Sequence, residues 1–175
     1  MGRADMRAVR RAADPAPGTS TLLPYLSGPA VEWARLDAAD PSVPRWQAVE
    51  GTMVFGDVSG FTKMSERLAR HGKVGAEEVA DAINACFEAL LDVAYRCGGS
   101  LIKFGGDALL LLFTGEGHAT RAAHAAVGMR SRLRSLGRID TTAGRVTLRI
   151  SIGVHSGTFH LFLVGGSHRE LIVAG

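Results

Sequence analysis

The stretch Val54-Phe55-Gly56-Asp57-Val58-Ser59-Gly60-Phe61-Thr62 joins an apolar run, an acidic residue and a glycine turn. The β-branched and apolar residues 52–58 predict a buried strand, and Ser59-Gly60 predicts the opening of a helix over residues 61–70. An aspartate where a buried strand meets a glycine turn is poorly placed for a core. It is well placed to bind Mg²⁺, which takes carboxylate oxygens and completes its shell with water and phosphate.

A second aspartate occupies a comparable position in Ile102-Lys103-Phe104-Gly105-Gly106-Asp107-Ala108-Leu109. Apolar runs over 100–104 and 108–113 flank Gly-Gly-Asp, which predicts a β-hairpin with Asp107 at its tip. If this tip lies beside the end of the first strand, Asp57 and Asp107 come within reach of one ion. Two converging carboxylates repel each other, whereas metal ions that bridge them to a triphosphate stabilise the pair. The adjacent helix start adds unpaired N–H groups that suit phosphate.

The remaining pattern predicts an α/β sandwich with a largely antiparallel sheet. Amphipathic periodicity predicts helices over 76–97 and 118–136. Alternation of apolar and polar residues predicts a strand over 145–155, and two more strands are expected over 158–164 and 170–173. The expected order is βααββαβββ. Because the chain stops directly after a strand, we expect a domain that is incomplete at its C-terminus.

Residues 1–49 differ in composition from residues 50–175. All six prolines of the chain lie in the first range, which predicts a proline-rich N-terminal arm laid on a domain that starts near residue 50. We expect Trp33 and Trp46 to anchor this arm on the domain surface, with a partner interface as the alternative.

Composition excludes several classes of function. The formal charge of +3 is carried by scattered basic residues, which argues against a nucleic-acid groove. No run approaches the ~20 apolar residues of a membrane span, and no apolar signal sequence precedes the arm. Cys86 and Cys97 lie about 16 Å apart along one predicted helix and cannot pair. Reduced thiols predict a cytoplasmic protein.

Together, the two aspartate motifs resemble the catalytic domain of class III adenylyl/guanylyl cyclases, over roughly residues 49–175. The chain is most similar to the first cyclase half of the soluble, bicarbonate-responsive type and of its bacterial tandem-domain relatives. The resemblance implies a ferredoxin-like, palm-type fold that converts ATP to cyclic AMP and pyrophosphate between two cyclase domains. It implies two Mg²⁺ ions, replaceable by Mn²⁺, bound at Asp57, Val58 and Asp107, and a triphosphate-binding turn formed by Ser59, Gly60, Phe61 and Thr62.

The chain also departs from this family. Complete members carry an Asn-x-x-x-Arg pair a few residues beyond the glycine that Gly175 matches. The one asparagine here, Asn84, lies in a predicted helix four residues before Glu88, so the pair is absent. Lys103 matches the lysine that contacts the purine, but the position of its acidic partner falls near Ile172. Without that partner, Lys103 either holds an anion such as bicarbonate, as in relatives with a degenerate pocket, or reaches solvent at the sheet edge.

Three hypotheses for function remain open at this point. The first is the metal-binding half of an adenylate cyclase, completed by a second cyclase domain from a longer polypeptide or another chain. The second is a non-catalytic, cyclase-like regulatory module that binds nucleotide or bicarbonate, which the missing Asn-Arg pair favours. The third is a diguanylate cyclase, whose Gly-Gly-Asp-Glu-Phe hairpin is similar to Gly105-Gly106-Asp107. The residues Ala108-Leu109 that follow depart from that pattern.

Overall fold

The computed structural model describes residues 45–136, 138–142, 144–165 and 170–175. Most of the predicted N-terminal arm, including Trp33, lies outside these residues. The elements in chain order are β1 (Arg45–Ser59), α3 (Phe61–Leu68), the 3₁₀ helix η2 (Ala69–His71), α4 (Gly72–Arg96), β2 (Ser100–Gly105), β3 (Ala108–Thr114), α5 (His118–Leu136), β4 (Arg138–Thr141), β5 (Gly144–Thr147), β6 (Arg149–Val164) and β7 (Glu170–Ala174).

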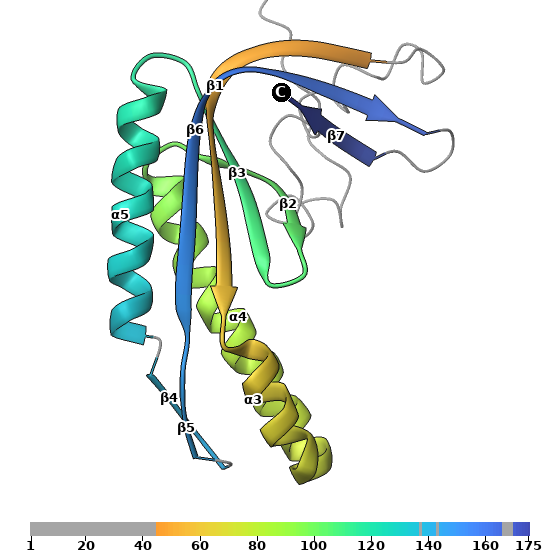
Figure 1. Cartoon of the computed structure of the whole chain (residues 1–175), viewed down its shortest axis with the longest axis vertical. Helices are drawn as coiled ribbons and strands as arrows, with labels where there is room; N and C mark the ends of the chain where they lie inside the picture. Colours follow the sequence, from red (N-terminus) through yellow and green to blue (C-terminus); the bar gives the residue numbers. More distant parts are fainter. Residues whose placement is uncertain (1–44, 137, 143, 166–169) are drawn as a thin grey trace, which may run out of the picture.

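Five strands form one sheet in the order β2-β3-β1-β6-β7, and β4 pairs only with β5 in a separate hairpin. Every pairing is antiparallel. Figure 1 shows α4 and α5 beside the lower part of the sheet, and it shows β1 and β6 bending together near the top of the view. The predicted mixed α/β fold with an antiparallel sheet is confirmed.

The sheet buries its two faces in two different cores. Successive side chains of a strand point to opposite faces, so Val54 packs under the helices whereas Met53 packs on the other side. The larger core joins strand residues to helix residues, among them Val58, Met64, Leu68, Leu90, Leu109, Leu111 and Met129. The smaller core forms where the curled sheet brings β6 and β7 towards β2 and β3, and contains Met53, Ile102, Leu112, Phe159, Leu161 and Leu171.

The predicted starts of the first strand and the long helix are wrong. β1 begins at Arg45, before residue 52, because residues 45–51 pair with the outer half of β6. β1 therefore crosses the expected boundary between residues 49 and 50, and the division into arm and domain stays a prediction. The long helix begins at Gly72, not at residue 76. A side chain at Gly75 would collide with the Leu68 carbonyl, so this glycine allows α4 to pass close to α3.

The predicted division of the later strands is also wrong. The strand expected over 145–155 is split: residues 145–147 belong to β5, whereas residues 149–155 join the strand expected over 158–164 in β6. β6 pairs with β1 from Arg149 to Leu163. β4 was not predicted, because its four residues carry no clear alternation. The first helix ends at Leu68 and continues as the 3₁₀ helix η2 rather than reaching residue 70.

Candidate active site

The two predicted metal-binding aspartates lie at the same end of the sheet. Asp57 is the third residue from the end of β1, and its register partners are Ala108 on β3 and Ser151 on β6. Asp107 is in the turn that joins β2 to β3. The Val58 N–H donates a hydrogen bond of 3.1 Å to the Asp107 carbonyl. This backbone bond ties the end of β1 directly to the hairpin turn, so the two acidic residues are brought together.

The three predicted metal-binding residues differ in what they offer to an ion. The Asp57 side chain is half-buried on the sheet face opposite α4 and α5, and Asp107 is exposed. The Val58 side chain is fully buried in the larger core, so only its backbone carbonyl could serve as a ligand. The possible donors are therefore two carboxylates and one carbonyl, all of them hard oxygen ligands.

This donor set fits Mg²⁺ only in part. Within the described residues, no group of three or more His, Cys, Asp or Glu side chains is placed to hold a metal ion. Magnesium commonly uses one or two carboxylates and keeps water or substrate phosphate in its other positions. Asp57 and Asp107 fit an ion that shares its coordination with a bound phosphate, not one enclosed by protein.

The predicted triphosphate turn depends on Gly60. Its φ of 112° lies in the left-handed region, which favours glycine. A Cβ at this position would lie 2.8 Å from the Thr147 carbonyl oxygen, so the turn packs directly on the backbone at the end of β5. Phe61 is buried and its ring centroid is 6.0 Å from that of Phe87, which fixes the first turn of α3 on α4.

The start of α3 leaves polar groups free on the surface. The side chains of Ser59 and Thr62 are exposed, and no side chain caps this helix N-terminus. The first N–H groups of a helix have no partner inside the helix, and they carry the positive end of the helix dipole. The turn can therefore bind an anionic group through its backbone, next to the carboxylate of Asp57.

Arg149 adds a positive charge, although it is not among the predicted site residues. It is the first residue of β6 and pairs in register with Ser59, so its side chain is on the same sheet face as Asp57. Arg149 is exposed. The signal was present in the alternation of Arg149 and Ser151 with Ile150 and Ile152, but without the β1–β6 register nothing linked this alternation to the turn.

Lys103 lies on the same face but has an acidic partner. Its register partner Leu110 is in turn paired with Phe55, so Lys103 is two strands and one side-chain row from Asp57, roughly 12 Å away. Its Nζ is 3.6 Å from Glu170 Oε1 on β7. Glu170 lies two residues before Ile172, the position expected for the acidic partner of the family, and the curl of the sheet brings it over β2. The role of Lys103 in a purine or anion pocket stays a prediction. Both side chains are exposed, and such pairs contribute at most about 1 kcal/mol.

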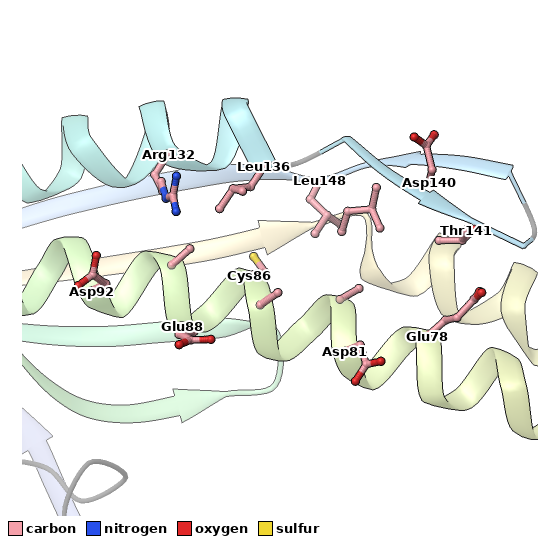
Figure 2. A pocket seen from close by; sticks show the side chains of 14 residues that line it. Glu78, Asp81, Cys86, Glu88, Asp92, Arg132, Leu136, Asp140, Thr141 and Leu148 are labelled. Carbon is pink, nitrogen blue, oxygen red and sulfur yellow. The ribbon is translucent and has the colours of Figure 1, made fainter.

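Neither aspartate lines the two cavities described next. One of about 660 Å³ is bounded by α4, α5 and the β4–β5 hairpin, and Figure 2 shows acidic side chains such as Asp81, Glu88 and Asp92 around it. Cys86 also lines it, and burial raises the pKa of this thiol to about 11. Asn84, the one asparagine of the chain, lines a second cavity between α4 and β2, together with Phe104 and Gly106 of the hairpin.

Comparison with known proteins agrees with this geometry. Residues 44–173 match the family model of the adenylate and guanylate cyclase catalytic domain. The chain is 29% identical over 140 residues to adenylate cyclase type 10 of Homo sapiens, covering 77% of this chain and 9% of that protein. No helix in the described ranges is long and apolar enough to cross a membrane.

Two solved structures have the same fold. A bacterial light-regulated adenylyl cyclase aligns with a TM-score of 0.69 at 20% identity, covering 90% of this chain and 45% of that one. The guanylyl cyclase Cya2 aligns with a TM-score of 0.60 at 28% identity, covering 75% of this chain and 65% of that one. The family match covers most of the chain, and the strand ends that carry Asp57 and Asp107 lie within it. The chain belongs to the adenylate and guanylate cyclase catalytic domain family.

Proposed function

We propose that this chain supplies the metal- and triphosphate-binding half of an adenylate cyclase active site. The observation that carries the proposal is the Val58–Asp107 backbone hydrogen bond, which holds Asp57 and Asp107 at one end of the sheet beside the α3 N-terminus. The substrate is ATP and the products are cyclic AMP and pyrophosphate. The adenylate cyclase relatives support ATP as the substrate.

In the proposed reaction the ribose 3′-oxygen attacks the α-phosphorus, and the bond from that phosphorus to the bridging oxygen of pyrophosphate breaks. Asp57, Asp107 and the Val58 carbonyl would hold two Mg²⁺ ions, or Mn²⁺ in their place. Bound there, the metal would activate the 3′-hydroxyl and neutralise the leaving group. The N–H groups at Ser59–Thr62 orient the triphosphate, and Arg149 adds positive charge on the same face.

A second cyclase domain is needed to complete this site. The face that carries Asp57 is open to solvent beside Phe55, which is half exposed. Asn84 lies on α4, four residues before Glu88, so it does not belong to an Asn-x-x-x-Arg pair. We propose that a complementing cyclase domain covers this face and provides that pair. Unpaired Cys86 and Cys97 and an intracellular substrate support a cytoplasmic location.

A second candidate function involves the exposed Lys103 on β2. A cyclase-like regulatory module would bind nucleotide, or bicarbonate near Lys103, without turnover. The Lys103–Glu170 contact bears on this alternative, because an anion would have to compete with the carboxylate for the ammonium group. Binding of bicarbonate that strengthens in Glu170→Gln, without cyclic AMP production under any condition, would support the regulatory function.

The test is Mg²⁺- and Mn²⁺-dependent production of cyclic AMP by this chain, alone and mixed with a cyclase domain that carries an Asn-x-x-x-Arg pair. We expect activity only in the mixture. Asp57→Asn and Asp107→Asn keep the size of each side chain but remove its charge, so each should lower that activity by at least about 10²-fold. Their unfolding transitions should match that of the unmodified chain. Full activity in either variant would contradict the metal assignment.

A further inference from the structure

The outer halves of β1, β6 and β7 present an unusual row of apolar side chains to solvent. Trp46 pairs in register with Phe162, and Phe162 pairs with Ile172. Residues directly opposite each other in an antiparallel sheet share one face, so the three form a row across three strands. Their neighbours Leu161 and Leu171 point to the other face and are buried in the smaller core. The row therefore lies on the outer face of this part of the sheet.

This row, with Val164 and His160, is called the outer apolar face below. Trp46 is 65% exposed, Ile172 43% and Val164 40%. The ring centroid of His160 lies 6.1 Å from that of Trp46 and 6.4 Å from that of Phe162. These contacts make the face continuous. Contiguous apolar surface on a folded domain marks a site where another surface packs.

The chain itself contains a segment suited to this face. Residues 21–36 read TLLPYLSGPAVEWARL, with seven large apolar or aromatic side chains, one glutamate and one arginine. The segment thus has no net charge and much apolar area. Pro24 and Pro29 lack the N–H that strand pairing needs, so the segment is suited to lie across a face and not to extend the sheet edge.

Chain connectivity favours this segment over a separate partner. Only eight residues separate residue 36 from Arg45, the first residue of β1, and a span of this length reaches up to about 30 Å. The outer apolar face begins at the next residue, Trp46. A tethered segment acts at an effective concentration in the millimolar range, which a second copy in dilute solution does not reach. We propose that residues 21–36 pack on the outer apolar face and shield Trp46 from water.

The two tryptophans make a direct test possible. Trp33 and Trp46 are the only tryptophans in the sequence, so Trp33→Phe leaves Trp46 as the single tryptophan of the full 175-residue chain, which excitation at the red edge selects over tyrosine. If the segment covers Trp46, the emission of Trp46 should be blue-shifted relative to the urea-unfolded chain, and acrylamide should quench it weakly. Leu22→Asp with Leu26→Asp, added to Trp33→Phe, should release the segment. Because 65% of Trp46 is exposed without cover, we expect the quenching constant to rise about twofold as buried area is lost.

Matched controls separate docking from added charge. Ser20→Asp, directly before the segment, with Ser27→Asp inside it adds the same charge without removing apolar side chains, and should leave Trp46 shielded. On the domain, Ile172→Asp should expose Trp46. Val127 on α5 is 70% exposed and lies outside this face, so Val127→Asp should leave Trp46 shielded. Circular dichroism should be the same for all variants.

Three results would overturn the proposal. Free quenching of Trp46 by acrylamide in Trp33→Phe would mean that nothing covers the outer apolar face. Shielding that survives both Leu→Asp changes would mean that another part of the molecule covers the face. Shielding that disappears on dilution, together with a dimer in sedimentation, would assign the face to a second copy of the chain.

Discussion

Replacing Gly60 by alanine tests whether the turn after β1 is both strained and closely packed. The φ of 112° places this residue where a side chain is disfavoured, at a cost of about 1–2 kcal/mol. The added Cβ would also lie 2.8 Å from the Thr147 carbonyl oxygen and 3.1 Å from Leu148 Cδ2. The carbonyl is backbone and cannot rotate away, so the turn must shift, at a further cost of about 1–3 kcal/mol. We expect Gly60→Ala to lower the free energy of unfolding by about 2–5 kcal/mol.

The matched control is Gly144→Ala at the tip of the β4–β5 hairpin. Its φ is 97°, and a Cβ there would meet nothing within 4 Å. Gly144→Ala therefore carries the conformational cost alone. The difference between the two variants in urea-induced unfolding measures the contact with Thr147 and Leu148. Equal losses of stability in both variants would refute the close-packing argument, and no loss in Gly60→Ala would refute the whole account of the turn.

The same change also separates the turn from the aspartates. A shift of the α3 N-terminus displaces the N–H groups that we propose for the triphosphate, while Asp57 and Asp107 keep their side chains. In the mixed cyclase assay, at a temperature where the variant is folded, Gly60→Ala should raise the KM for ATP more than it raises the concentration of Mn²⁺ needed for activity. A normal KM would mean that the turn does not bind the triphosphate.

Two further predictions concern the core. Burial raises the pKa of Cys86 from 9.0 to about 11, so this thiol should resist alkylation near neutral pH while the less buried Cys97 reacts. Because the thiol ionises first in the unfolded chain, the free energy of unfolding should fall as the pH rises from about 9 to about 11. Equal rates of alkylation of the two thiols, measured by mass spectrometry, would contradict this. The buried Thr52 hydroxyl lies 2.7 Å from both His118 Nδ1 and Ser156 Oγ, so Thr52→Val should cost about 1–3 kcal/mol in urea unfolding. Thr52→Ser keeps the hydroxyl, so it should lose clearly less free energy of unfolding than Thr52→Val. Equal losses in the two variants would show that the hydrogen bonds contribute little.

The elements with strong local signals were predicted well. The helix His118–Leu136 has the expected bounds, and the hairpin strands start at Ser100 and Ala108 as expected. These elements depend on apolar periodicity and on glycines at their ends, which are local features. The first half of β1 was missed because it is formed by pairing with β6, which is distant in the sequence. β4 pairs with the neighbouring β5, but it is only four residues long. Their own residues carry little periodic signal.

The amino-acid sequence alone determined that Asp57 lies at the end of one apolar strand and Asp107 directly before another, each beside a glycine turn. Strand alternation and turn conformation are properties of neighbouring residues, so they can be predicted locally. Only the tertiary structure decided which side chains share a face. The β1–β3 register and the Val58–Asp107 bond bring the aspartates together. The β1–β6 register places Arg149 beside Ser59, and the curl of the sheet gives Lys103 its partner Glu170. Such long-range pairings depend on how the whole sheet packs over its two cores, which no short stretch of sequence encodes.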